Sequence, residues 1–159
     1  MDQTFSLAIH GGAGTMRRDA MTPALEAEHH AGLRAALMAG HAVLAAGGTA
    51  LDAVTRAVME LEDDPLFNAG HGAVFTAGGR LEMDAAVMDG RTRAAGAVAG
   101  VLGPRNPVLA ARAVMEHSGC VLLVGEGALA FCREQGLAFE DAAYFHTCLL
   151  YTSPSPRDS

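Results

Sequence analysis

Large aromatic side chains are scarce in this sequence. Phe, Tyr and Trp together make up 5% of the 159 residues, and Trp is absent. Hydrophobic residues still account for 50% of the chain and Gly for 19 residues, so a core has to be built mainly from small side chains. Such a core suits layers whose backbones approach closely. The length and composition fit one globular domain rather than a disordered or fibrous polymer.

Runs of basic residues are also missing. The formal net charge is −7, and the densest positive features are the short Arg17-Arg18 and Arg91-Thr92-Arg93 segments. A protein that binds nucleic acid through its phosphates needs a larger basic patch. We therefore expect no nucleic-acid partner.

Long apolar runs are absent as well. No stretch approaches the roughly 20 apolar residues that a membrane-spanning helix needs. The N-terminus has an acid at Asp2 and few apolar residues before its glycines, unlike a signal peptide. We expect a cytoplasmic protein with no membrane partner. Cys120, Cys132 and Cys148 form no C-x-x-C pair, which favours reduced thiols over a disulfide framework or a zinc site.

Four segments carry helix signals. Thr22 can cap a helix whose first residue is Pro23, and Thr49 with Asp52 forms a variant of the capping box at the start of a second helix. The predicted helices start at Pro23, Thr49, Asn106-Pro107 and Gly127 and end at Gly47-Gly48, at Asp64-Pro65, near His117 and at Gln135. The stripe expected to be buried on the second helix is Leu51, Val54, Val58 and Leu61.

Five short apolar segments predict strands, and the first of them is expected to be buried. Gly78-Gly79 and Asp89-Gly90 are hairpin signals, which indicate an antiparallel sheet. Hairpins flanked by helices favour a mixed α/β (α+β) fold, with helices covering sheet layers, over a regular parallel βαβ fold. The predicted strands are 5–10, 73–76, 81–88, 95–102 and 121–124.

The segment 61–90 is the most specific part of the sequence, because turn residues, acids and one Asn gather there. Pro65, Gly70 and Gly72 can hold an irregular loop whose carbonyls converge on a hard cation such as sodium. Asn68 adds an amide that donates and accepts hydrogen bonds. Residue types alone leave open the simpler alternative of a tight turn with Asn and Gly at special backbone angles.

Six motifs in order carry a family resemblance. They are AIHGGAG at 8–14, AGG-ALDAV at 46–54, PLFNAGHGAVFT at 65–76, MDAAVMDG at 83–90, AGAVAGV at 95–101 and NPVLAARAVMEHSG at 106–119. Together they resemble the plant-type L-asparaginase/isoaspartyl peptidase family of N-terminal-nucleophile (Ntn) hydrolases, from about residue 4 to residue 147. Residues 148–159 turn to Ser and Pro and are interpreted as a disordered tail or a sequencing scar outside the family domain of residues 1–147.

The resemblance implies a four-layer αββα sandwich, of which this chain would be the N-terminal part. In the family a precursor cuts itself into an α subunit, like this chain, and a β subunit that begins with Thr. That Thr attacks the side-chain amide of asparagine or the isopeptide bond of β-aspartyl dipeptides, and its own α-amine acts as the base. The expected partners are therefore a β subunit, a small-molecule substrate and, in the parent enzyme, an (αβ)2 assembly.

The resemblance also implies site residues. Asn68 helps to orient the nucleophile, and Gly11 and Gly12 line the floor of the active site. A structural sodium ion is bound by backbone carbonyls, with no catalytic cofactor. His71 replaces a residue that is usually apolar in the family. The residues that match the sodium loop are Leu61, Glu62, Asp64, Phe67, Ala69 and His71.

The nucleophile itself has no counterpart in this sequence. The family nucleophile sits in a G-T-V-G-type segment, and neither Gly48-Thr49-Ala50 nor Gly14-Thr15-Met16 continues in that way. We therefore expect the chain alone to be inactive. The alternative is an orphan subunit that binds a partner through exposed edge strands and apolar faces without catalysis.

Other readings of the motifs are weaker. G-G-A-G at 11–14 is neither G-x-G-x-x-G nor a Walker A loop, which argues against a nucleotide site. The seven His residues show no metal-binding spacing. Asp89 is expected to hydrogen-bond in its hairpin, and a buried paired role is left open for Asp84. The acids at 26, 28, 60 and 62–64 are expected in solvated helix ends.

Overall fold

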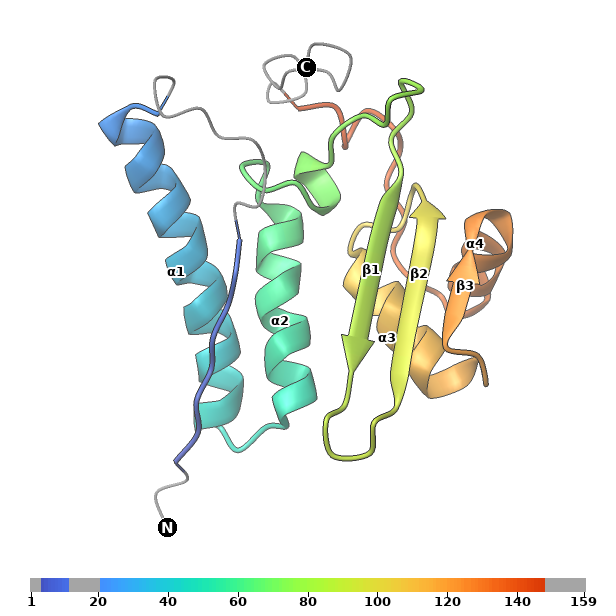
Figure 1. The fold of residues 1–159 in the computed structure, drawn as a ribbon, viewed down its shortest axis with the longest axis horizontal. Helices are drawn as coiled ribbons and strands as arrows, with labels where there is room; N and C mark the ends of the chain where they lie inside the picture. The colour runs from blue at the N-terminus through green and yellow to red at the C-terminus, as the bar shows by residue number, and fades with distance from the viewer. Residues whose placement is uncertain (1–3, 12–20, 148–159) are drawn as a thin grey trace.

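The computed structural model describes residues 4–11 and 21–147, which form four α-helices, one 3₁₀ turn and a three-stranded sheet (Figure 1). Gly12 and the tail 148–159 lie outside the described residues. The mixed α/β class is thus confirmed, while the four-layer sandwich remains a prediction. The elements are α1 (Pro23–Ala45), α2 (Ala50–Asp63), η1 (Gly70–Gly72), β1 (Met83–Met88), β2 (Ala95–Val101), α3 (Pro107–His117), β3 (Leu122–Val124) and α4 (Gly125–Glu134).

The first two helices begin where the sequence supplies a capping hydroxyl. The Thr22 side chain accepts a hydrogen bond from the Leu25 amide at 3.2 Å. The Thr49 side chain accepts one from the Asp52 amide at 3.1 Å, and its hydroxyl donates to the Asp52 carboxylate at 2.7 Å. Gly47 ends the α1 segment with a φ of +83°, a conformation that suits glycine. Both predicted N-termini are confirmed.

Because α1 and α2 pack closely, the buried face of α2 differs from the one that the sequence predicted. A Cβ atom on Gly40 would lie 2.9 Å from the Ala53 carbonyl oxygen, so the two helices meet through small residues. The predicted stripe was wrong in part, because Val54 is 37% exposed and lies away from this contact. The buried residues of α2 are Ala53, Thr55, Ala57, Leu61 and Glu62.

The sheet has the order β1-β2-β3, with an antiparallel first pair and a parallel second pair. The predicted hairpin at Asp89-Gly90 is confirmed, because the Asp89 carboxylate accepts from the Arg91 amide at 2.8 Å and from the Thr92 hydroxyl at 3.0 Å. A purely antiparallel sheet was not found, since α3 carries the chain back along the sheet before β3. The strand prediction was thus correct for β1, β2 and β3 and wrong about one strand direction.

Two predicted strands are not formed. Residues 5–10 run without strand pairing, and Leu7 and Ile9 are only half-buried. The described part of the chain places no strand beside them. Segment 73–76 forms only the isolated bridge between Phe75 and Leu81, around a turn that ends at Gly79 with a φ of +74°.

Asp84 lies at an irregularity in the register between β1 and β2. Its carboxylate accepts from the Gly100 amide at 2.8 Å, and its side chain is exposed. A buried paired role for Asp84 is therefore wrong. Its part is to satisfy a backbone amide where the regular ladder is interrupted.

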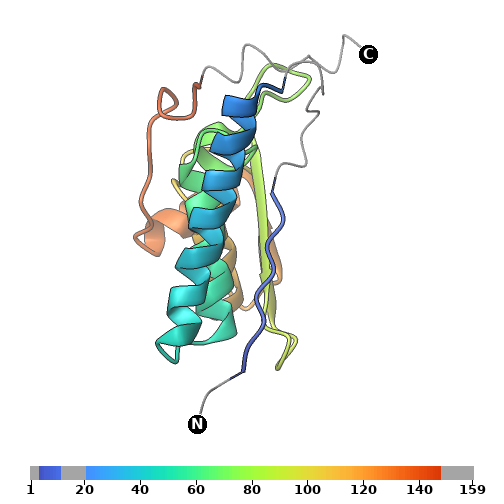
Figure 2. The ribbon, with the colours of Figure 1, turned by 90° about the vertical axis from the view of Figure 1, so that its left-hand side faces the viewer.

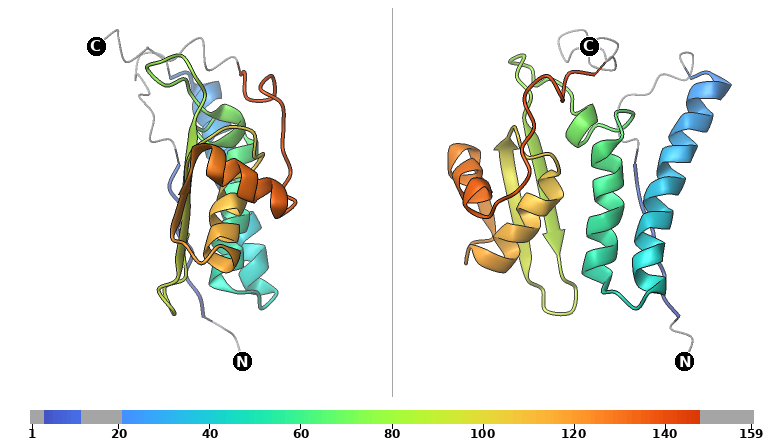
Figure 3. Two further views of the ribbon diagram at one scale, coloured as in Figure 1. Left: turned by 90° about the vertical axis from the view of Figure 1, so that its right-hand side faces the viewer. Right: turned by 180° about the vertical axis from the view of Figure 1, so that it is seen from behind.

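All four helices lie on one side of the sheet layer (Figures 2 and 3). α3 packs very closely, because a Cβ atom on Gly96 of β2 would lie 2.2 Å from the Ala111 carbonyl oxygen. The main core lies between the sheet, α3, α4 and Phe145, and a second core joins Ala36, Leu61 and Phe67. None of the helices in the described residues has the length and apolar composition needed to cross a membrane.

The other side of the sheet carries apolar side chains that no described element covers. Met88 of β1 is 55% exposed, and Leu122 and Val124 of β3 are 52% and 58% exposed. Met88 follows the buried Val87 in β1, and Leu122 and Val124 flank the half-buried Leu123 in β3. All three side chains therefore lie on the exposed side of the pleated sheet. We call this surface, together with Ala86 of β1, the open sheet face.

Gly127 in the first turn of α4 offers a simple test of the fold. A Cβ atom there would meet no atom within 4 Å, and the residue has no left-handed φ. Gly127→Ala is therefore expected to raise the free energy of unfolding by about 0.5–1 kcal/mol, because Ala loses less backbone entropy in a helix. Urea denaturation followed by circular dichroism measures this, and a destabilised variant would contradict the helical assignment.

Candidate active site

The loop that follows α2 is folded back on itself by its own hydrogen bonds. The Asp64 carboxylate accepts from the Leu66 amide at 2.9 Å. The carbonyls of Asp64, Phe67 and Ala69 accept from the amides of Phe67, Ala69 and Gly72 at 3.2, 2.7 and 3.0 Å. A carbonyl oxygen has two lone pairs, so each of these three keeps one for another donor or a cation.

Two glycines allow the loop to close. A Cβ atom on Gly70 would lie 2.3 Å from the Glu62 carbonyl oxygen, and one on Gly72 would lie 2.1 Å from the Phe67 carbonyl oxygen. The φ of Gly70 is also positive, at +50°. Backbone carbonyls thus crowd into positions that any other residue would fill with a side chain.

The closed loop packs against α1 and the N-terminal segment through Phe67. A Cβ atom on Gly11 would lie 3.1 Å from the Phe67 ring, and one on Gly32 of α1 would lie 2.7 Å from it. Gly32 also approaches the Asp64 carboxylate, at 2.4 Å from the same hypothetical Cβ. The structure therefore places Gly11 beside the loop, while its part in the floor of an active site remains a prediction. Gly32 was missed, although a glycine inside a helix is itself a signal, since it costs about 1 kcal/mol relative to Ala.

Asn68 lies at the exposed side of this loop. Its side-chain oxygen accepts a hydrogen bond from the Val74 amide at 3.1 Å. Within the described residues its side-chain nitrogen has no hydrogen-bond partner. The amide is thus held by its oxygen and can donate from its nitrogen to a ligand.

Glu62, the residue before the end of α2, points into the protein. It is 3% exposed, and its Oε1 accepts from the Val108 amide at 2.8 Å. Oε2 has no hydrogen-bond partner among the described residues, and the nearby Asn106 side chain donates to Asp63 at 3.2 Å. Burial raises the pKa of Glu62 to about 8, although the Val108 amide opposes that shift. The expectation of a solvated helix end is therefore wrong for Glu62, whose carboxyl group caps the N-terminus of α3.

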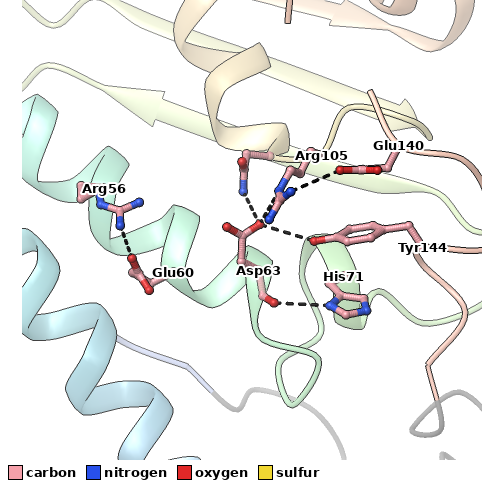
Figure 4. Close-up of polar contacts among 8 residues, drawn as sticks. Arg56, Glu60, Asp63, His71, Arg105, Glu140 and Tyr144 are labelled. Atoms are coloured by element: carbon pink, nitrogen blue, oxygen red, sulfur yellow. Dashed lines mark hydrogen bonds and ion pairs between the residues drawn. The ribbon is translucent and has the colours of Figure 1, made fainter. Parts of the chain in front are cut away.

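The Asp63 side chain points away from that of Glu62, and one of its oxygens accepts hydrogen bonds from three side chains (Figure 4). Its Oδ1 accepts from Arg105 Nε at 3.1 Å, from Asn106 Nδ2 at 3.2 Å and from the Tyr144 hydroxyl at 3.5 Å. Arg105 also contacts Glu140 at 3.3 Å. The end of α2, the start of α3 and the segment 138–147 are joined at this carboxylate.

His71 packs on Tyr144 beside this cluster (Figure 4). The two rings are stacked, with centroids 4.4 Å apart and an interplanar angle of 19°. His71 Nδ1 lies 3.4 Å from the Asp63 carbonyl oxygen. Burial raises the pKa of Tyr144, so its hydroxyl stays protonated. His71 thus has a specific neighbour in the fold.

Cation binding at the loop would depend on backbone oxygens. Within residues 4–11 and 21–147, no three side chains of His, Cys, Asp or Glu are grouped as metal ligands. The carbonyls of Glu62 and Phe67, two residues of the predicted sodium set, lie against Gly70 and Gly72 in the crowded loop. Uncharged oxygen donors on a tightly curved backbone fit a hard monovalent cation better than a transition metal.

Comparison with known proteins places these features in a family. A family model described as asparaginase matches residues 3–153. The isoaspartyl peptidase of Salmonella typhimurium is 52% identical over 145 residues, which are 91% of this chain and 46% of that protein. The isoaspartyl peptidase of Escherichia coli is 51% identical over 145 residues, and the plant-type L-asparaginase of Pyrococcus abyssi is 52% identical over 132 residues. These cover 91% and 82% of this chain.

The chain spans somewhat less than half the length of these relatives, between 41% and 46%. The family match nevertheless includes all of the described residues, among them the glycine-lined loop with Asn68. With the family model covering most of the chain and several relatives near 50% identity, the protein belongs to the plant-type asparaginase/isoaspartyl peptidase family.

Proposed function

We propose that this chain is the α-subunit part of a hydrolase that cleaves the side-chain amide of L-asparagine and β-aspartyl (isoaspartyl) peptide bonds. The observation that carries the proposal is the loop that holds Asn68, which lies inside a match of about 50% identity to isoaspartyl peptidases and plant-type asparaginases. The nucleophile would be an N-terminal Thr on a β subunit, released by autocatalytic cleavage. This chain would supply the support around it.

In that reaction the Thr hydroxyl attacks the amide carbonyl while its α-amine accepts the proton. The C–N bond then breaks, the leaving ammonia or amine takes a proton, and water hydrolyses the acyl-enzyme ester. Asn68 is suited to orient the nucleophile, because Val74 fixes its oxygen and its nitrogen is available as a donor. Gly11 would leave room beside the loop, since a Cβ atom there would lie only 3.1 Å from the Phe67 ring.

The open sheet face supports the proposal of a β-subunit partner. Its exposed Met88, Leu122 and Val124 form an apolar surface on a sheet that helices cover on one side only (Figure 2). Among the described residues β1 pairs with β2 alone, so its other edge is unpaired. Segment 4–11 runs in the same layer, on the other side of α2 (Figures 1 and 2). A second sheet seated here would complete the αββα sandwich.

Sodium would be held by the carbonyls of Leu61, Glu62, Asp64, Phe67, Ala69 and His71. The ion would supply no catalytic chemistry, and its charge would draw the loop carbonyls together. The residues of this chain that permit such a cradle are Gly70 and Gly72, because their missing side chains leave the carbonyls free to approach. We further propose a cytoplasmic (αβ)2 assembly by analogy with the family.

Reconstitution tests the proposal. The chain is co-produced with the remaining half of the Salmonella typhimurium isoaspartyl peptidase, and release of ammonia from asparagine and of aspartate from β-aspartyl dipeptides is measured. The chain alone is expected to be inactive, because it contains no G-T-V-G-type segment. The complex is expected to be active, and Asn68→Ala is expected to lower kcat by about 100-fold, as for loss of one positioned hydrogen-bond donor.

Each outcome has a clear meaning. Activity of the chain alone would contradict the expectation that it lacks the nucleophile. A stable complex that hydrolyses neither substrate would favour the second candidate, a partner-binding subunit without catalysis, which the open sheet face also supports. An undiminished kcat in the Asn68→Ala complex would show that Asn68 does not orient the nucleophile.

A further inference from the structure

The segment 138–147 is fixed to the fold by hydrogen bonds that lie outside the Asn68 loop. The Arg105 amide donates to the Ala138 carbonyl at 3.0 Å, and the Glu140 amide donates to the Gly103 carbonyl at 2.8 Å. Farther along, the Phe145 side chain is fully buried in the main core. These contacts make the segment a support held to the fold outside the loop, and Ala73 of residues 64–76 packs in the same core as Phe145.

Two aromatic contacts join this support to the loop. Tyr144 stacks on His71 at 4.4 Å, and His146 packs edge-on against Phe75 at 5.7 Å. The Val74 amide, which donates to the Asn68 side chain, lies between the two contact points in the sequence. Any movement of positions 71 and 75 away from the support would therefore move the donor that orients Asn68.

The stack of Tyr144 on His71 is a better-formed contact than the hydrogen bonds that these two residues make with Asp63. The Tyr144 hydroxyl is 3.5 Å from the Asp63 carboxylate and His71 Nδ1 is 3.4 Å from the Asp63 carbonyl, both long for hydrogen bonds. The two rings, in contrast, are in close stacking contact, with centroids 4.4 Å apart, and Arg105 lies over the Tyr144 ring at 5.5 Å. An aliphatic residue at position 71 would leave the Tyr144 ring without its aromatic partner.

We propose that Tyr144 and His71 are positioning residues, which hold the loop so that Val74 orients the Asn68 side chain. The catalytic consequence rests on the proposed function, in which Asn68 acts on the nucleophile. The geometric part stands on this chain alone.

Amide hydrogen exchange of the Val74 N–H in the 159-residue chain tests the geometric part. Asn68→Ala is the reference for loss of the hydrogen bond, and amides of β1 and β2 report global stability. Tyr144→Leu is expected to speed exchange at Val74 by about three- to tenfold, as expected for losing an aromatic pair, with little change in the sheet. Tyr144→Phe keeps the ring and is expected to stay within about twofold of the wild type.

A double-mutant cycle shows whether the two rings act together. His71→Ala and Tyr144→Leu should each speed exchange at Val74, and the double variant should be no faster than the worse single variant, because either change removes the same contact. Additive effects would overturn the proposal. Unchanged exchange in Tyr144→Leu, or equal acceleration at Val74 and in the sheet, would overturn it as well.

The reconstituted enzyme supplies the second readout. Tyr144→Leu is expected to lower kcat by about three- to tenfold with KM nearly unchanged, and Tyr144→Phe should retain the wild-type kcat. An unchanged kcat in Tyr144→Leu, in a complex where Asn68→Ala is impaired, would overturn the catalytic consequence. An inactive wild-type complex contradicts the proposed function instead, and the exchange at Val74 then decides the positioning role on its own.

Discussion

Gly72→Ala is expected to lower the free energy of unfolding by about 3 kcal/mol, the upper end of the usual range for overpacked positions. The added Cβ atom would lie 2.1 Å from the Phe67 carbonyl oxygen and 2.7 Å from the Pro65 carbonyl oxygen. Both neighbours are backbone atoms, so the clash cannot be relieved by turning a side chain. The loop has to open, and Asn68 moves with it.

Gly90→Ala is the matched control, because a Cβ atom there meets nothing within 4 Å and the residue has no left-handed φ. It should change stability by no more than about 0.5 kcal/mol. Urea unfolding of both variants, followed by circular dichroism, measures the difference. Equal stability of the two variants would show that the loop is not closed as described.

Glu62→Ala is expected to cost about 3 kcal/mol for a different reason. It leaves the Val108 amide at the start of α3 without its acceptor and creates a cavity in a buried position. Glu62→Gln is the conservative partner, since an amide oxygen can accept from Val108 in the same volume. The expected order of stability at pH 5 is therefore wild type close to Gln, with Ala well below both. Chemical denaturation of the three proteins tests this order.

The stabilities of the wild type and of Glu62→Gln should respond differently to pH. The pKa of Glu62 lies near 4.5 in the unfolded chain and at about 8 in the folded one, so the folded protein keeps a proton that the unfolded chain has released. Stability from this group is complete below about pH 4.5 and is lost as the pH rises toward 8. In a sodium-free buffer the wild type should lose about 3 kcal/mol relative to Glu62→Gln between pH 5 and pH 8. A constant difference would contradict a buried, neutral carboxyl group.

Local signals in the sequence were sufficient to predict most of the elements. Thr22 and Thr49 mark helix starts by capping, and Asp89-Gly90 marks a hairpin, because each acts through hydrogen bonds to its own neighbours. The errors concern contacts between distant segments. Residues 5–10 have the composition of a strand, but strand pairing needs a partner, and the described chain does not place one there.

The candidate site shows the same division between local signals, which could be predicted, and contacts between distant segments, which could not. The residues around Asn68 were found through their motif, whereas the side chain of Glu62 was expected in solvent because carboxylates usually are exposed. Its partner Val108 is 46 positions away, so no local pattern could indicate the bond. Tyr144 was missed for the same reason, since its contact with His71 depends on how the chain returns to the loop.

The stack of Tyr144 on His71 also gives the molecule an optical property. The chain has no Trp and two Tyr residues, so its ultraviolet emission comes from Tyr144 and Tyr151. A phenol beside an imidazole and the Asp63 carboxylate is expected to be quenched, since both neighbours can accept its proton in the excited state. Movement of the loop away from Tyr144 should therefore brighten tyrosine fluorescence, which makes the protein its own reporter of events at this loop without any attached dye.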